Sequence, residues 1–247
     1  MGPRAAHWAI TMLVGGLTLA ASPAASARDT LPDLGIARPS DIKIGAPDGA
    51  RLLRYTTTIV NVGAGAFELH AQRASTSDTE MAVTQRIFDD AGGFRDVSTT
   101  AAAFYSGDGH NHWHIRDLYR TELALLDGSH VVTSEKRGFC FWDNVRYRLS
   151  LPGAPGSHFY NDDGCGVASS LTVSMGLSVG WGDAYPAGLA GQNIDITGLD
   201  PGDYRLTVTA DAGGWFTESN EANNSTWVDL QIKAKGQPRA LRYGPTP

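Results

Sequence analysis

The chain carries three histidines at alternate positions, His110, His112 and His114. Alternate side chains of an extended strand point to one face, so the three imidazoles would share a face. Imidazole is the commonest metal ligand at neutral pH, and three neutral imidazoles suit copper or zinc. The outer two α-carbons of a flat strand lie about 13 Å apart, near the limit at which one ion can be reached. The pattern therefore predicts a metal site on a strand that bends or bulges. The alternative is a histidine-rich strand that binds nothing.

Short segments with the composition of β-strands surround these histidines. They are rich in β-branched and aromatic residues and are separated by Gly, Asp and Asn turns. No segment after residue 27 shows a sustained helical apolar stripe. The sequence therefore predicts an all-β fold, an antiparallel β-sandwich-like single domain with long loops. The predicted strands are 52–62, 66–70, 81–88, 99–104, 119–126, 131–142, 194–196, 204–209 and 227–232.

Asp127-Gly128 is the strongest hairpin signal in the chain, because this dipeptide favours a tight turn between two strands. A hairpin here would place the strand that carries Lys136 beside the continuation of the histidine strand. The segments 143–170 and 177–191 have the composition of loops, and the second contains Trp181 and Tyr185. Gly and aromatic residues concentrated in irregular segments often build sites on a rigid scaffold.

Residues 1–27 have the pattern of a secretory signal. Arg4 is followed by an apolar run over 8–21 and by the small residues Ala25-Ser26-Ala27. The alternative is an uncleaved anchor, and no later segment approaches the ~20 apolar residues of a membrane span. We therefore expect a secreted protein without stable membrane insertion after cleavage. Its parts would be a catalytic domain over 28–232 and a disordered tail over 233–247.

The charge and the cysteines restrict the function further. A net charge of −6 disfavours nucleic acid as a partner and is compatible with a cationic substrate such as an amine. Cys140 and Cys165 are the only cysteines. In an exported chain they most simply form one disulfide, worth about 3 kcal/mol. Neither belongs to a Cys-x-x-Cys motif, which disfavours a metal or redox role.

Four elements of the sequence, in the same order, resemble the lysyl oxidase family. Together they cover roughly residues 105 to 230 and are specific as a set. They are His110-x-His112-x-His114, Lys136-x-x-Phe139-Cys140, the segment Leu177-Ser178-x-Gly180-x-x-Asp183-x-Tyr185 with Gln192-x-Ile194-Asp195-Ile196, and Glu218-Ser219-Asn220-x-x-Asn223-Asn224.

The resemblance implies copper at the three histidines and a lysine tyrosylquinone cofactor made from Lys136 and Tyr185. Copper is then expected rather than zinc, because zinc is redox-inert and could not make the quinone. A quinone condenses with a primary amine and acts as an electron sink while a base removes the α-proton. Dioxygen is the second substrate. Asp183 is the carboxylate nearest to Tyr185 in sequence and is the predicted base; Asp117 is the alternative.

The resemblance also implies a calcium site at the C-terminal element. Carboxylate, carbonyl and amide oxygens are the hard donors that calcium prefers. The alternative is a loop held by polar hydrogen bonds alone. The implied ligands are Asp33, Leu34, Glu218, Asn220, Asn223 and Asn224.

Compared with animal members of that family, this chain lacks further cysteines and has Thr121 where those members carry another histidine. It is more similar to short bacterial members. The predicted function is a secreted copper-dependent amine oxidase acting on primary amines, including peptidyl-lysine. The alternative is a secreted copper-binding or adhesive β-sandwich module without oxidase activity.

Overall fold

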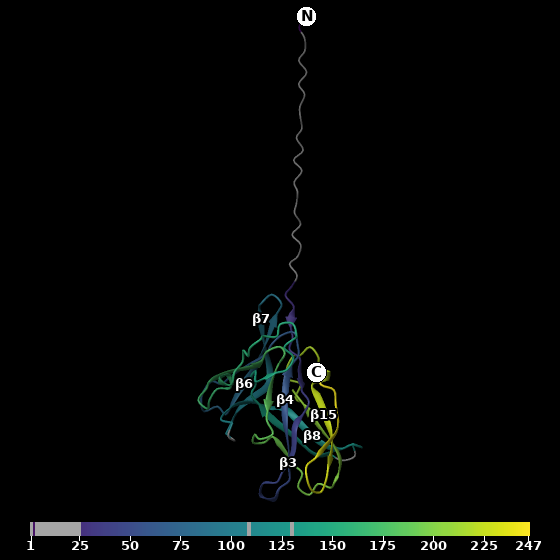
Figure 1. Ribbon diagram of the computed structural model, residues 1–247. Coiled ribbons are helices and arrows are strands. Elements are labelled where there is room, and N and C mark those ends of the chain that lie inside the picture. Colours follow the sequence, from purple (N-terminus) through teal and green to yellow (C-terminus); the bar gives the residue numbers. More distant parts are fainter. Residues whose placement is uncertain (1, 3–25, 108–109, 129–130) are drawn as a thin grey trace.

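Strands make up almost all of the regular structure (Figure 1). The computed structural model describes residues 2, 26–107, 110–128 and 131–247, without the side chains of residues 131–137. The predicted signal segment therefore lies outside the described residues, except for three of its positions. No helix in the described ranges is long and apolar enough to cross a membrane. In chain order the elements are β1 (Asp29–Thr30), β2 (Leu34–Ile36), β3 (Ser40–Gly45), η1 (Pro47–Gly49), β4 (Leu52–Asn61), β5 (Phe67–Gln72), β6 (Glu80–Asp89), β7 (Phe94–Ser106), β8 (His112–Leu125), β9 (Val131–Phe139), β10 (Val145–Arg146), η2 (Asp162–Cys165), β11 (Thr172–Leu177), β12 (Trp181–Tyr185), β13 (Asn193–Asp195), β14 (Gly202–Thr209), η3 (Glu221–Asn223), β15 (Ser225–Ile232) and β16 (Arg239–Tyr243).

The strands form two antiparallel sheets, which confirms the predicted all-β class. The larger sheet has the order β11-β5-β6-β7-β8-β14-β15-β16, with β1 added on β6 and β9 on β8. The smaller has the order β10-β12-β4-β13, with β2 and β3 also paired to β4. Buried residues of both sheets belong to one hydrophobic cluster. The sheets therefore share a single core.

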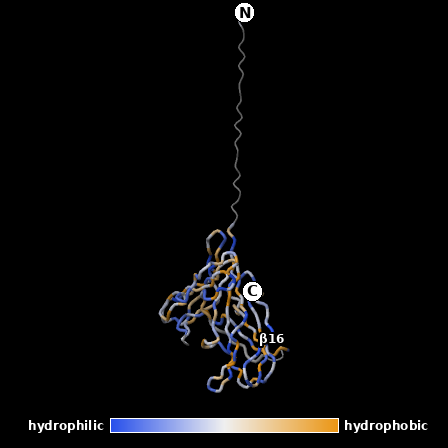
Figure 2. Tube along the Cα trace, viewed as in Figure 1, coloured by the Kyte–Doolittle hydropathy of each residue, from blue (hydrophilic) through white to orange (hydrophobic). Residues whose placement is uncertain are grey.

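The period-2 pattern of the sequence explains how the strands bury one face. In β14, Tyr204, Leu206 and Val208 are buried, while the residues between them are partly exposed. Hydrophobic and hydrophilic residues are interspersed along the whole trace of the domain (Figure 2). Such alternation gives each strand one face for the core and one for solvent.

The histidine strand lies inside the larger sheet rather than at its edge. β8 pairs with β9, with Ile115 opposite Phe139 and Arg120 opposite Lys136, so the predicted strand pairing is confirmed. On its other side β8 pairs with β7, where Phe104 is opposite His114. Two neighbouring strands therefore fix the backbone that carries the histidines.

The segment 177–191 is not wholly a loop, because β12 forms within it. Tyr185 is opposite Thr57 and Gly182 is opposite Val60 of β4. A Cβ at Gly182 would lie 2.8 Å from Val60 Cγ1 and 2.9 Å from the Ile59 carbonyl oxygen. The glycine thus permits a close approach to β4, and the sheet pairing outweighs the loop-like composition.

The expected disorder of the tail is wrong for its last residues. β16 pairs with β15 in the larger sheet. The carbonyl oxygen of Pro247 accepts hydrogen bonds from Tyr147 Oη at 2.9 Å and Arg148 Nη2 at 2.8 Å. The basic and proline residues of the tail gave the expectation of disorder, but an unpaired sheet edge stabilises this segment as a strand.

The predicted disulfide between Cys140 and Cys165 is present. The two α-carbons are 6.0 Å apart and both residues are fully buried. Cys140 directly follows β9 and Cys165 is the last residue of η2. The bond therefore attaches the irregular segment after β10 to the end of β9.

Replacing both cysteines by serine should lower the free energy of unfolding by about 3 kcal/mol, because the unfolded chain regains the entropy of a loop with sequence separation 25. Urea denaturation under non-reducing conditions measures the change. Wild-type protein treated with dithiothreitol is the control and should lose the same amount. A double variant as stable as the untreated wild type would contradict the expectation.

Candidate active site and cation cluster

The three predicted metal-binding histidines come together. One ligand atom from each of His110, His112 and His114 lies within 4.8 Å of the others, and the Nε2 atoms of His112 and His114 are 2.9 Å apart. His110 precedes β8 in a turn, and Asn111 has φ 53°, in the left-handed region. This turn is the bend that the sequence analysis expected, and it brings the first ring toward the other two.

The cluster fits a copper or zinc ion. Nitrogen ligands about 2.0–2.1 Å from an ion lie roughly 3–4 Å from one another, so small ring rotations are sufficient. Three imidazoles without a thiolate or carboxylate are a donor set suited to copper or zinc. His114 is 4% exposed and the other two rings are half-buried. The site is thus reachable from solvent on one side and enclosed on the other.

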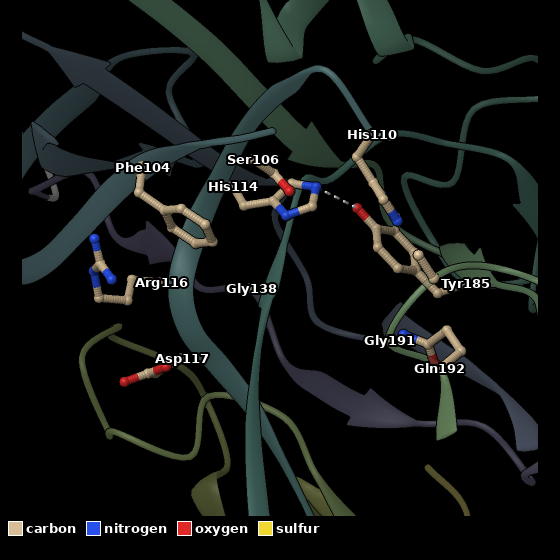
Figure 3. A pocket seen from close by; sticks show the side chains of 11 residues that line it. Phe104, Ser106, His110, His114, Arg116, Asp117, Gly138, Tyr185, Gly191 and Gln192 are labelled. Atoms are coloured by element: carbon tan, nitrogen blue, oxygen red, sulfur yellow. Dashed lines mark hydrogen bonds between the residues drawn. The ribbon is translucent and has the colours of Figure 1, made fainter. Parts of the chain in front are cut away.

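Tyr185 brings a phenol oxygen from the smaller sheet to this cluster. Its Oη accepts a hydrogen bond from the backbone N–H of Cys140 at 3.0 Å and lies 3.3 Å from His114 Nε2 (Figure 3). The ring stacks on Phe139, with centroids 3.9 Å apart, and the residue is 5% exposed. The tyrosine is therefore held in one orientation beside a candidate metal ligand.

Lys136 is placed by its backbone alone. It stands in β9 opposite Arg120, two residues before Gly138 and three before Phe139. Gly138 lines a hollow together with Tyr185 and His114. Residues two apart in a strand share a face, so position 136 is on the same face of β9 as Gly138. The side chain of Lys136 lies outside the described part of the chain.

Tyr185 borders two hollows. The first, of about 190 Å³, is lined by Tyr185, His114, Asp117, Gly138 and Gln192 among others (Figure 3). The second, of about 390 Å³, is lined by apolar residues such as Trp142 and Leu189 together with His110, His112 and Tyr185. The first hollow is lined mainly by polar groups, and the second is lined mainly by apolar groups together with two of the histidines.

The two candidate bases occupy different places. Asp117 lines the first hollow, has φ 52° and lies in a register shift between Ile115 and Tyr119. This bulge turns the half-buried carboxylate of Asp117 toward the hollow. Asp183 is fully buried, accepts a hydrogen bond from Asn144 Nδ2 and lines neither hollow. Burial raises the pKa of Asp183 well above its usual value, which favours a neutral carboxyl.

Three residues of the site had no role assigned from the sequence. Phe139 provides the stacking surface for Tyr185, and Gln192 is buried at the wall of the first hollow. A Cβ at Gly138 would lie 2.7 Å from Phe104 Cε1 and 3.0 Å from His114 Cβ. Glycine is therefore needed at this close contact. All three lie in or next to the four sequence elements singled out above. Their place in these elements was the only feature of the sequence that pointed to them.

A second cluster of charged groups lies around Glu218. One carboxylate oxygen from each of Asp211, Glu218 and Glu221 lies within 4.8 Å of the others. Burial raises the pKa of Glu218 to about 9, and the neighbouring charges of Glu221 and Asp211 act in the same direction. The backbone N–H of Leu34 donates a hydrogen bond to Glu218 Oε2. Asp211 and Glu221 were not among the ligands predicted from the sequence, although Glu221 stands inside the predicted C-terminal element.

The predicted calcium ligands meet at this cluster, with one exception. Asn223 Nδ2 donates to Asp33 Oδ1 at 2.8 Å, and Asn224 Nδ2 donates to Glu218 Oε1 at 3.1 Å. The Oδ1 atoms of both asparagines are buried without a hydrogen-bond partner among the described residues. Asn220 is exposed and accepts from the N–H of Ala222 as the N-cap of η3. Converging carboxylates with unpaired amide oxygens fit a calcium ion.

Comparisons with known proteins give a consistent result. The model of the family described as Lysyl oxidase matches residues 98–238, a span that holds the histidines, Lys136, Tyr185 and Glu218. The chain is 27% identical over 129 residues to lysyl oxidase homolog 4 of Mus musculus, 30% over 125 residues to protein-lysine 6-oxidase of Gallus gallus, and 28% over 118 residues to lysyl oxidase homolog 2 of Xenopus tropicalis. These matches cover 52%, 49% and 47% of this chain and 15%, 26% and 14% of the relatives. The chain thus corresponds to about a quarter or less of each relative's length.

Replacing His112 by alanine is expected to weaken copper binding by more than about 100-fold, because mutating residues that only orient a ligand already costs about 10- to 100-fold. Competition titration with a copper chelator measures the affinity. His158→Ala, which removes an exposed histidine, is the matched control and should bind as the wild type does. Equal copper binding by the wild type and a His110→Ala, His112→Ala, His114→Ala triple variant would reject these ligands.

Calcium at about 100 times its dissociation constant should raise the unfolding temperature by about 5 to 10 °C, since binding to the folded state alone adds about 2.7 kcal/mol. Glu218→Gln should abolish this shift by removing a charged ligand. Thermal unfolding with and without calcium measures it, and Glu122→Gln on β8 is the matched control. The same calcium shift in Glu218→Gln and the wild type would exclude this site.

Proposed function

Because the chain belongs to the lysyl oxidase family, we propose that it is a copper-dependent amine oxidase acting on primary amines, including peptidyl-lysine. The reaction consumes the amine, dioxygen and water, and it releases an aldehyde, ammonia and hydrogen peroxide. The observation that carries the proposal is the position of Tyr185, whose Oη lies 3.3 Å from a nitrogen of the histidine cluster. A phenol beside a copper site is a suitable target for oxidation to a quinone.

In this proposal His110, His112 and His114 hold copper, and Lys136 and Tyr185 form lysine tyrosylquinone. The quinone supplies an electron sink for the amine substrate. The chain's own groups fix its position: Phe139 covers one face of the Tyr185 ring, and the Cys140 N–H binds its oxygen. Such an orientation limits the reacting groups to a few geometries, which is a main source of rate in enzymes.

We assign the role of base to Asp117. The assignment is supported by its place in the wall of the first hollow, which Tyr185 also lines, whereas the base predicted from the sequence was Asp183. For Asp183 we propose a positioning role. It accepts from Asn144 Nδ2, and Asn144 Oδ1 in turn accepts from the N–H of Ala184 at 2.8 Å. The buried carboxyl of Asp183 thus orients the side-chain amide of Asn144. This amide in turn holds the backbone of Ala184, the residue directly before Tyr185.

The proposal includes calcium at the Glu218 cluster as a structural ion. It would join Asp33 and Leu34, at the start of the domain, to the loop before β15. We also propose that the chain is exported with residues 1–27 as its signal. A buried disulfide supports export, because such bonds persist mainly in oxidising compartments.

Peptide mapping of copper-loaded, aerated protein tests the cofactor. The expected product joins the Lys136 and Tyr185 peptides, with a mass equal to their sum plus one oxygen and minus four hydrogens. His112→Ala protein should lack this product, because copper is required to make it. His158→Ala is the control. Unmodified Lys136 and Tyr185 in protein that oxidises amines would disprove the proposed cofactor, and copper binding without cross-link or peroxide would favour the binding-module alternative.

A further inference from the structure

An unpaired oxygen lies in the wall of the first hollow. Gln192 is 3% exposed and lines this hollow with Tyr185 and Asp117. Its Nε2 donates a hydrogen bond to Tyr119 Oη, whereas its Oε1 is buried without a hydrogen-bond partner among the described residues. Buried polar atoms are almost always paired, and an exception at a hollow requires an explanation. A ligand that donates a hydrogen bond is the simplest one.

The amide of Gln192 is held firmly in place. Tyr119, which receives its N–H, is fully buried in β8 and packs edge-to-face on Phe139 at 5.8 Å. The backbone N–H of Gln192 donates to the Leu189 carbonyl at 3.2 Å, and Gly191 before it has φ 74°. With its nitrogen bound to Tyr119, the side chain has its oxygen left for a ligand in the hollow.

The charges around the hollow favour an amine as this ligand. Asp117 has no hydrogen bond or ion pair with any described residue. Arg116, which also lines the hollow, is paired with Glu80 at 2.8 Å and lies over the Phe104 ring at 4.7 Å. Glu80 therefore balances the positive charge of Arg116, and none of the described residues forms an ion pair with the carboxylate of Asp117. A negative charge beside an acceptor oxygen suits a group with N–H donors and positive charge.

The size of the hollow restricts the rest of the ligand. Its volume is about 190 Å³, and a cavity of about 150 Å³ is known to accommodate benzene. An unbranched aminoalkyl chain such as a lysine side chain fits this space. The ring of Phe104 and the backbone at Gly138 line the same hollow.

We propose that Gln192 Oε1 accepts a hydrogen bond from the amino group of the substrate. The inference rests on the proposed function and adds the group that recognises the substrate nitrogen. Figure 3 shows Gln192 and Asp117 around the same hollow as Tyr185. Gln192 would thereby fix the nitrogen near Tyr185 and leave the neighbouring carbon for Asp117.

The first test uses the full chain purified without copper, in which Tyr185 is unmodified. Saturation-transfer NMR measures the binding of n-butylamine to the wild type, Gln192→Met, Gln192→Glu and the exposed control Gln72→Met. Binding is expected for the wild type and the control. Gln192→Met should bind roughly tenfold more weakly or worse, the expected effect of losing one buried hydrogen bond to a charged donor. Gln192→Glu keeps an acceptor oxygen and should retain binding.

The second test uses the copper-loaded protein. Phenylhydrazine titration should give the same cofactor content in Gln192→Met as in the wild type. The KM for n-butylamine should rise about tenfold or more in this variant, with a smaller change in kcat. The inference would be overturned if Gln192→Met bound n-butylamine as tightly as the wild type and had the same KM. It would also be overturned if the copper-free wild type did not bind n-butylamine. Binding that depends on Gln192 in a chain that never reacts with phenylhydrazine would support the inference and reject the proposed oxidase function.

Discussion

The hydrogen bond from the Cys140 N–H to Tyr185 Oη joins the two sheets at the candidate site. Cys140 directly follows the strand that pairs with the histidine strand, and Tyr185 ends a strand of the smaller sheet. The stacking of Phe139 on Tyr185 adds an apolar contact at the same point. Both contacts form only when the two sheets are a fixed distance apart. The side-chain packing between the sheets therefore also sets the distance between the Tyr185 phenol and the histidines. The disulfide at Cys140 limits movement of this point further.

Local backbone conformation then directs the polar side chains. Asn111 and Asp117 stand on either side of the last two histidines, with φ 53° and 52°. Asparagine and aspartate tolerate the left-handed region better than most residues, although it still stores some strain. The first of these residues turns His110 toward His112 and His114, and the second turns a carboxylate into the hollow at Tyr185. A regular strand would place the same side chains farther apart, so the strain is used to assemble the site.

The Glu218 cluster differs from the histidine site because several negative charges lie close together in it. Asp211, Glu218 and Glu221 converge at a partly buried place, and the desolvation that raises the pKa of Glu218 also destabilises its ionised form. A cation would offset both effects. The hydrogen bonds from Leu34 to Glu218 and from Asn223 to Asp33 cross from the first strands to the last loop. The cluster therefore links the two ends of the domain, and its net charge is the reason that an ion is expected there.

The sequence by itself determined the features that depend on local patterns. Alternating hydrophobic residues gave the all-β class, Asp127-Gly128 gave the pairing of β8 with β9, and the histidine spacing gave the grouping of three imidazoles. Two cysteines in the chain gave one disulfide. These inferences succeed because strand alternation and turn chemistry involve residues that are close in the chain.

Only the tertiary structure decided which groups meet across the two sheets. It made a strand of the segment that holds Tyr185, and it paired part of the tail that was expected to be disordered, as β16, with β15. It also put Asp117 rather than Asp183 in the first hollow. It also added Asp211 and Glu221 to the acidic cluster and left Gln192 Oε1 without a partner among the described residues. Cys140 and Tyr185 are 45 residues apart, and no local pattern encodes such a contact. It follows from the packing of the core, which depends on the shapes of all its side chains together.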